Sequence, residues 1–186
     1  MRKTKKNSKQ KMAYKFLAKP ILEQIIMISK TFGCCRKLWN LMLDDHNFYY
    51  SQLGKYLYVT PADYKELEEY AYLREVDSLA LANVQMNLES AFSAFFAKKA
   101  KYPKFKSKKS RQSYTTNNVN NAIRLENKDG KDYIKLPKIG LVEIIKHRTV
   151  KGKIKNVTIS KDTDDRYYNK EDNNKKRYKD KIITNL

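Results

Sequence analysis

The sequence has few of the features that identify secreted, membrane or zinc-binding proteins. Among its 186 residues there are only two cysteines, and they are neighbours, Cys34 and Cys35. Adjacent cysteines cannot join distant segments by a disulfide, and no CxxC pair is present to hold zinc. No run of about 18 apolar residues occurs, and the basic N-terminus lacks the apolar segment of a signal peptide. We therefore predict a reduced, cytoplasmic chain without a membrane span, cofactor or metal ion.

Acidic residues are also scarce relative to basic ones. The 20 carboxylates face 40 Lys and Arg side chains, which leaves a net charge of +20. Residues 1–19 and 98–111 each carry eight basic side chains and no acid, whereas residues 20–97 hold ten of the carboxylates. Self-repulsion of this size opposes compaction and is usually balanced by a polyanionic partner. The clustering predicts a binding surface on a more balanced scaffold.

Helical patterns occupy the first half of the chain. Pro20 precedes apolar residues at helical spacing, Gly33 is expected to break that helix, and a second helix is expected from Cys34 to about Tyr50. This outline predicts a helix-turn-helix-like pair, which any helical hairpin would share. Thr60-Pro61 is typical of a helix start, and the segment from Asp77 or Ser78 to about Lys99 carries one apolar stripe.

After residue 112 the apolar period changes from 3.6 to 2. Strands are predicted in "QSYTT", "AIRLE", "DYIKL", "LVEIIKH" and "KNVTIS", with a hairpin turn at Asp129-Gly130. A further short strand is predicted in "AYKFLAKP" near the N-terminus. The order predicts an α+β fold, in which a β-barrel is interrupted by a helical insertion.

The strongest functional signal is the segment "AKKAKYPKFKSKKSRQSYTT", residues 97–116. Its cations have no interspersed acids, Pro103 favours an extended path, and the rings of Tyr102, Phe105 and Tyr114 could stack on bases. A solvated surface run is the alternative. We predict that the cations contact phosphates, which position a protein without reading sequence. Five phosphate contacts would give a slope of log affinity against log salt near −4.

Other parts of the chain offer weaker candidates. Arg36, Lys37 and Asn40 could contact a nucleic-acid groove, or they could form a balanced surface helix. Adjacent Asp44, Asp45 and His46 would fan apart on a helix, so a two-metal nuclease site is not predicted there. The complete set of predicted nucleic-acid contacts is Lys15, Lys19, Arg36, Lys37, Asn40, Ser78, Asn83, Lys98, Lys99, Lys101, Tyr102, Lys104, Phe105, Lys106, Lys108, Lys109, Arg111, Ser113, Tyr114 and Lys138.

Five segments of the chain carry a family resemblance. They are "AYKFLAKP", "TFGCCRKLWNLML", "YLREVDSLALANVQMNLESAFSAFFAK", "YPKFKSKKSRQSYTT" and "IKLPKIGLVEIIKHR…GKIKNVTISK", in this order. Together they resemble the N-terminal half of the transposon-encoded TnpB/OrfB family. The resemblance implies an oligonucleotide-binding-type barrel, the wedge domain, with an inserted helical recognition domain. It also implies guide RNA and double-stranded DNA as partners, with the protein reading duplex shape and a short target-adjacent motif.

The resemblance also sets the expected domains. They are a flexible basic arm at 1–12, the wedge barrel at 13–19 and 101–161, the helical insertion at 20–100 and a disordered or degenerate tail at 162–186. Family members continue into a RuvC-like nuclease domain and a zinc ribbon, which this sequence does not match. We therefore expect a nucleic-acid-binding part without catalytic residues. The alternatives are the binding half of a split endonuclease completed by a separate RuvC chain, and a ribosome- or RNA-associated basic protein.

Overall fold

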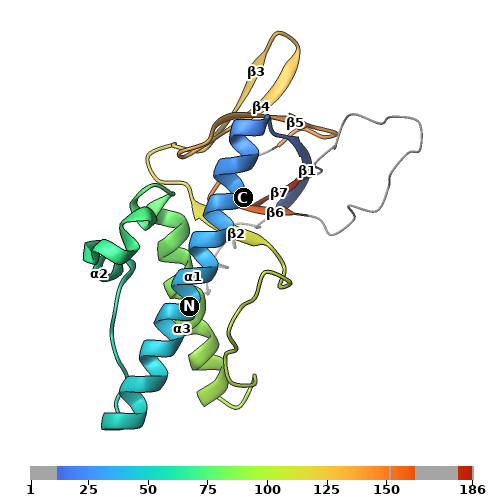
Figure 1. Ribbon diagram of the computed structural model, residues 1–186. Helices are drawn as coiled ribbons and strands as arrows, with labels where there is room; N and C mark the ends of the chain where they lie inside the picture. Colours follow the sequence, from blue (N-terminus) through green and yellow to red (C-terminus); the bar gives the residue numbers. More distant parts are fainter. Residues whose placement is uncertain (1–11, 151, 162–179, 186) are drawn as a thin grey trace, which may run out of the picture.

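The fold joins an antiparallel sheet to a long helix pair. The computed structural model describes residues 12–150 and 152–161, and the backbone of 180–185. The helical elements are α1 (Leu22–Leu53), α2 (Pro61–Glu66), the 3₁₀ helix η1 (Glu68–Arg74) and α3 (Ser78–Phe96). The strands are β1 (Ala13–Lys19), β2 (Ser113–Asn117), β3 (Arg124–Lys128), β4 (Lys131–Leu136), β5 (Gly140–Ile145), β6 (Asn156–Lys161) and β7 (Asp180–Asn185). Figure 1 shows α1 and α3 side by side, extending away from the sheet.

The seven strands form one open sheet in the order β2-β6-β7-β1-β5-β4-β3, with every pair antiparallel. The α+β class and all six predicted strands are confirmed, and Asp129 and Gly130 both have positive φ in the β3–β4 turn. A closed barrel is not confirmed, because β2 and β3 lie at opposite edges without pairing to each other. Alternation of apolar residues predicts which face of each strand is buried, but not whether the end strands meet.

The predicted helix break at Gly33 is wrong. Helix α1 runs through this position without interruption, so the expected helix-turn-helix pair is a single helix here. Glycine costs about 1 kcal/mol in a helix interior relative to alanine, which apolar burial on both sides can outweigh. The buried positions continue at helical spacing across the glycine: Ile28, Phe32, Cys35, Leu38, Trp39 and Met42.

Helix α3 is tied to the sheet at its first turn. Asp77 is the N-cap residue and accepts a hydrogen bond from the Leu79 backbone N–H at 3.0 Å. Its second carboxylate oxygen accepts a short hydrogen bond from the Thr116 hydroxyl on β2, and both side chains are buried. The predicted cap of α2 is also present, because the Thr60 backbone N–H donates to Asp63 at 2.7 Å. Capping satisfies the unpaired N–H groups at a helix start.

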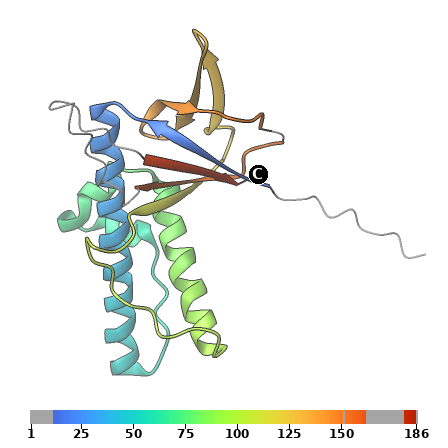
Figure 2. The same cartoon turned by 90° about the vertical axis from the view of Figure 1, so that its right-hand side faces the viewer.

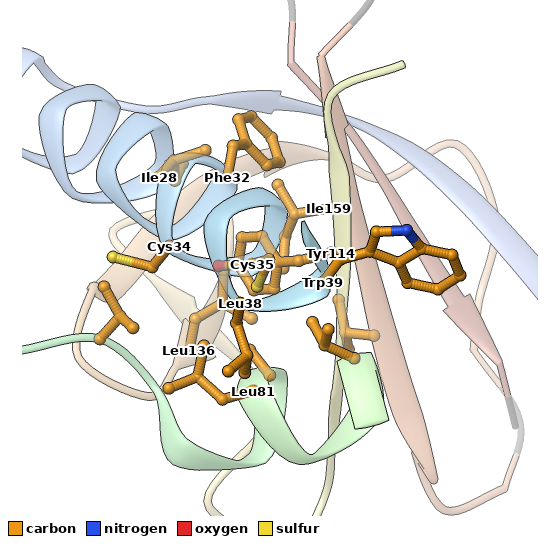
Figure 3. Close-up of a cluster of buried hydrophobic side chains, with 14 of the residues drawn as sticks. Ile28, Phe32, Cys34, Cys35, Leu38, Trp39, Leu81, Tyr114, Leu136 and Ile159 are labelled. Atoms are coloured by element: carbon orange, nitrogen blue, oxygen red, sulfur yellow. The ribbon is translucent and has the colours of Figure 1, made fainter. Parts of the chain in front are cut away.

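The core lies where α1, α3 and the sheet meet. Leu38 on α1, Leu81 on α3 and Ile159 on β6 are all fully buried. Figure 3 shows them in one cluster with Phe32 and Tyr114, whose rings meet edge to face at 5.6 Å. The helix pair and the sheet therefore share one apolar core, although the predicted domain boundaries within the chain stay a prediction.

The ends of the chain lie largely outside the described residues. Residues 1–11 and 162–179, most of the predicted arm and tail, are not described. The backbone of 180–185, however, forms β7, which pairs with β1 on one side and β6 on the other. The prediction of an unstructured tail is wrong for these six residues. No helix in the described part of the chain is long and apolar enough to span a membrane.

Candidate nucleic-acid interface

Residues 97–112, here called the connector, link the end of α3 to β2 without forming a helix or strand. The chain reverses at Lys98, which has a φ of 57°, and the Lys99 backbone N–H closes the turn on the Ala94 carbonyl at 2.8 Å. The connector then runs back beside α1 and α3 towards the sheet, as Figures 1 and 2 both show. Residues 101–107 contain no turn, whereas Lys108 and Lys109 form one, so the extended path expected from Pro103 stays a prediction.

Side chains of α1 hold the connector backbone. The indole N–H of Trp39 donates to the Lys104 carbonyl at 3.0 Å. The Asn40 amide donates to the Lys106 carbonyl at 2.9 Å and accepts from the Lys106 backbone N–H at 2.8 Å. These bonds satisfy backbone groups of an irregular segment that would otherwise depend on water. The connector is therefore anchored in one conformation while its other side faces solvent.

The connector's cations lack acidic partners. Apart from Lys106, which is discussed below, these are Lys98, Lys99, Lys101, Lys104, Lys108, Lys109 and Arg111, all of them exposed residues. None of them forms an ion pair with a carboxylate in the described part of the chain. Unpaired, closely spaced cations attract a polyanion and release its counterions on binding.

Lys106 is the exception within the connector. Its ammonium nitrogen lies 3.7 Å from the centroid of the Trp39 ring, a cation–π contact. The residue as a whole is exposed, yet the ring shields the charged end, and this burial lowers the pKa of the Lys106 ammonium. Lys106 thus fastens the connector to α1, and its role as a predicted phosphate contact is correspondingly weaker.

A small polar cleft opens where the connector meets α1, α3 and β2. It has a volume of about 70 Å³ and is lined by Arg36, Asn83, Asn87, Arg111 and Ser113, among others. None of the described residues that line the cleft carries a carboxylate. Arg36 is oriented by a hydrogen bond to Gln112 at 3.2 Å. The volume is far below the roughly 150 Å³ of a cavity that holds benzene, so the cleft suits water or one oxyanion rather than a base.

The predicted stacking rings have three different environments. Tyr114 is only 6% exposed and belongs to the core, so its prediction as a stacking platform is wrong. Side chains alternate between the two faces of β2, and Tyr114 lies on the buried face; the strand was predicted, but not which of its faces is covered. Tyr102 is partly exposed and donates a hydrogen bond to Asn47 on α1. Phe105 is exposed and keeps its predicted accessibility.

Several predicted helix contacts have structural partners. Asn40 holds the connector, as described above, so a groove contact by this amide is not supported. Lys37 is exposed, with its nitrogen 5.4 Å from the Tyr70 ring centroid. On α3, the Ser78 hydroxyl accepts from Lys65 at 2.9 Å, and the Asn83 amide donates to the Leu79 carbonyl at 2.8 Å.

The sheet residues of the predicted set lie apart from the connector. Lys15 and Lys19 are on β1, the central strand, and Lys138 lies in the turn between β4 and β5, on the half of the sheet away from β2. Lys19 also pairs with Glu143 at 3.5 Å. The structure therefore brings Arg36, Asn83, Ser113 and the connector together, and separates them from these three lysines.

The Asp44-Asp45-His46 run does not converge on a common point. Asp45 accepts a short hydrogen bond from Tyr64, Asp44 is exposed, and His46 is buried against the rings of Tyr56 and Phe92. Burial lowers the pKa of the His46 imidazole, and its Nδ1 atom has no hydrogen-bond partner in the described structure. No group of three or more potential metal ligands occurs among the described residues.

Sequence reasoning missed the residues that hold the connector. Trp39 is buried in the core, and its N–H also anchors the connector. Asn47 and Gln112 had no recognisable signal, since single amides on a helix or in a loop have many ordinary roles. A usable signal was the seven-residue spacing of Asn40 and Asn47, which places both amides on one side of α1.

Two comparisons with known proteins found similar sequences. Residues 9–55 match the helix-turn-helix domain of OrfB proteins of the IS605 type. A Streptomyces pristinaespiralis protein, named "Putative RNA-guided DNA endonuclease", is 39% identical over 88 residues. That alignment covers 45% of this chain and 22% of the relative, so the chain spans only a small part of the relative's length.

The matched helix-turn-helix region corresponds here, within the described residues, to β1 and the uninterrupted helix α1. The family resemblance drawn from the five sequence segments and the two matches lead to the same assignment. They indicate that part of the chain is similar to proteins of the TnpB/OrfB family, through the helix-turn-helix match at residues 9–55 and the 88-residue alignment.

Proposed function

We propose that this chain binds the sugar–phosphate backbone of nucleic acid along the connector and the adjoining cleft. One observation carries the proposal: the exposed connector cations have no carboxylate partners in the described structure and are held on α1 by Trp39 and Asn40. A pre-ordered cationic segment loses little conformational entropy when a polyanion binds. The cleft adds Arg36 and Arg111 where one phosphate group would fit.

The partners proposed are guide RNA and target-adjacent duplex DNA. The relative's name supports an RNA-guided context, and phosphate contacts by the connector would suit either polymer. In this proposal the chain binds and positions nucleic acid without cutting it. Purified chain incubated with magnesium and plasmid DNA is expected to leave the DNA intact, and cleavage by this chain alone would overturn the non-catalytic part of the proposal.

Salt-dependent binding tests the proposed interface. Affinity for a structured RNA and for duplex DNA is measured by fluorescence anisotropy between about 50 and 200 mM salt. The connector variant replaces Lys104, Lys108, Lys109 and Arg111 by Gln. The control variant makes the same charge change on the β3–β4 hairpin, at Arg124, Lys128, Lys131 and Lys135, on the far edge of the sheet.

The slope of log affinity against log salt on duplex DNA is expected near −4 for the wild type. The connector variant should lose about 3 to 4 of that slope if each replaced cation contacts one phosphate. The hairpin variant should keep most of it. Equal losses in the two variants would show a diffuse charge effect and overturn the assignment to the connector, and wild-type failure to bind either polymer would overturn the function itself.

A further inference from the structure

Figure 1 shows that α1 and α3 both reach far from the sheet at one end. Exposed rings lie in the residues that follow or end these helices there. We call Tyr56, Phe96 and Tyr102 the aromatic tip; their exposed fractions are 49%, 64% and 44%. All three contact the same buried ring, that of Phe92, with centroid distances of 6.1, 6.5 and 5.7 Å. The three exposed rings thus pack around the buried Phe92 ring and form one group on the surface.

The polar contacts of the aromatic tip restrict its rings further. Tyr102 donates its hydroxyl hydrogen to Asn47 and meets Phe95 edge to face at 5.1 Å. Tyr56 lies against the buried His46 ring at 4.4 Å. Aromatic side chains with two restricted torsions present a large flat surface at small entropic cost on binding. The tip is therefore pre-ordered for contact with another flat group.

The charge around the aromatic tip selects the kind of partner. Lys98, Lys99 and Lys101 follow Phe96 directly in the chain, Lys55 precedes Tyr56, and none forms an ion pair in the described residues. The carboxylate of Glu89, the one acid that acts on the pKa of Tyr56, accepts a hydrogen bond from Gln85 at 2.9 Å. Two copies of this surface would repel each other, whereas a polyanion with exposed bases satisfies both rings and lysines.

We propose that the aromatic tip is a stacking site for unpaired nucleotides of a strand whose phosphates follow the connector. The inference rests on the proposed function, because the connector begins directly after Phe96 and contributes Tyr102 to the tip. Bases within a duplex are covered by their neighbours on both faces, so apart from the terminal pairs it is unpaired nucleotides that can lie on these rings. The tip therefore gives the chain a preference for single-stranded or flanking unpaired segments over a blunt duplex.

The test compares Phe96→Ala with Phe48→Ala. Phe48 is 69% exposed on α1 and makes no ring contact with another described residue, so it is a matched control outside the aromatic tip. Affinity for a single-stranded oligonucleotide and for a blunt duplex of the same sequence is measured at one salt concentration. Phe96→Ala should weaken single-strand binding between about fivefold and 150-fold and leave duplex binding within about twofold. Phe48→Ala should change neither.

A second variant separates stacking from simple apolar contact. Phe96→Leu keeps apolar volume at the end of α3 but removes the ring, so it should weaken single-strand binding nearly as much as Phe96→Ala. A 2-aminopurine base in the oligonucleotide should be quenched by the wild type and not by either Phe96 variant. Full quenching by Phe96→Leu would overturn the stacking role.

The outcomes distinguish this inference from the proposed function. Unchanged single-strand binding by Phe96→Ala, with binding lost in the connector variant, would overturn the aromatic tip and leave the proposed function standing. Absence of binding to any nucleic acid by the wild type would overturn both. Analytical sedimentation tests whether the aromatic tip instead binds a second copy of the chain. A wild-type dimer at micromolar concentration that becomes a monomer in Phe96→Ala would show self-association and overturn the stacking site.

Discussion

The connector and the sheet use the same kinds of cation in opposite ways. On the sheet, Lys19 and Lys131 share Glu143 at 3.5 and 3.4 Å, and Lys146 pairs with Asp132 at 2.6 Å. On the connector, none of the cations has a carboxylate partner in the described structure. Cross-strand pairs of opposite charge stabilise neighbouring strands, whereas unpaired cations contribute repulsion unless an anion arrives from outside.

The position of a cation, rather than the number of cations, therefore decides its role. A cation beside a carboxylate stabilises the fold, and an exposed cation without one can bind an external anion. A net charge of +20 predicts a polyanionic partner without saying where it binds. The ion pairs of the sheet neutralise the lysines that form them, so these lysines add little to the attraction of a polyanion. Among the described residues, the connector beside α1 is the segment where exposed cations without a carboxylate partner follow one another most closely.

The largest effect on stability is expected at the contact between the start of α3 and strand β2. Asp77→Ala removes the N-cap of α3 and leaves the buried Thr116 hydroxyl on β2 without its acceptor. Losing a cap and leaving a buried polar group unpaired should together lower the free energy of unfolding by about 2–4 kcal/mol. Urea denaturation measures the loss.

Asp63→Ala is the control for the Asp77 variant, because it removes a capping carboxylate from an exposed helix start instead. Its effect should be clearly smaller. A loss in Asp77→Ala no larger than that in Asp63→Ala would show that the carboxylate does not join the helices to the sheet.

The anchoring of the connector can be broken by Asn40→Ala. This change removes both hydrogen bonds to the Lys106 backbone, worth about 1–2 kcal/mol together. We expect faster hydrogen exchange at the Lys106 amide and nucleic-acid affinity weaker by about fivefold to 30-fold, with an unchanged salt slope. The same substitution at Asn127, which bonds Asp132 on the hairpin, should leave affinity unchanged. Normal affinity with faster exchange would show that pre-ordering is unimportant.

The continuity of α1 is tested by Gly33→Ala. Nothing lies within 4 Å of an added Cβ at this position, and the backbone is helical, so alanine should raise the free energy of unfolding by about 0.5–1 kcal/mol. Gly54→Ala should instead be destabilising, because Gly54 ends the helix with a φ of 62°. Destabilisation by Gly33→Ala would indicate a real turn there and favour two separate helices.

The smallest expected effect is a pH dependence confined to the helix pair. Burial lowers the pKa of His46, although the Asp45 and Glu89 carboxylates oppose this shift. The unfolded chain therefore binds a proton below about pH 6.5 more readily than the folded chain does, and stability falls as the pH is lowered through that range. His46→Phe should flatten the unfolding free energy between about pH 7 and 5. An equal decline in variant and wild type would contradict this role.

Local patterns predicted most of the elements and missed what depends on distant contacts. The strands and the caps at Thr60 and Asp77 follow from apolar period and turn chemistry, and they are confirmed. The break at Gly33 failed because local propensity was weighed without the burial on both sides of it. The open sheet and the pairing of β7 depend on long-range registers that no short window contains.

The sequence predicted which segment carries the candidate site, but not how that segment is held. Charge without acids marked residues 97–116, most of which form the connector, and its nucleic-acid role stays a prediction. The buried position of Tyr114 and the bonds of Trp39 and Asn40 to the connector depend on which faces of β2 and α1 meet in space. Residues of one type therefore have different roles that only the folded structure separates. Some anchor the connector, some belong to the core, and some are exposed cations.

The most direct test of the account is a lysine-protection experiment on the wild-type chain. Acetylation of each lysine is measured by mass spectrometry with and without a structured RNA at low salt. We predict strong protection of Lys98, Lys101, Lys104, Lys108 and Lys109 on the connector, and none of Lys128, Lys131 and Lys135 on the hairpin. Protection of the hairpin lysines with connector lysines as reactive as in the free protein would contradict the central claim.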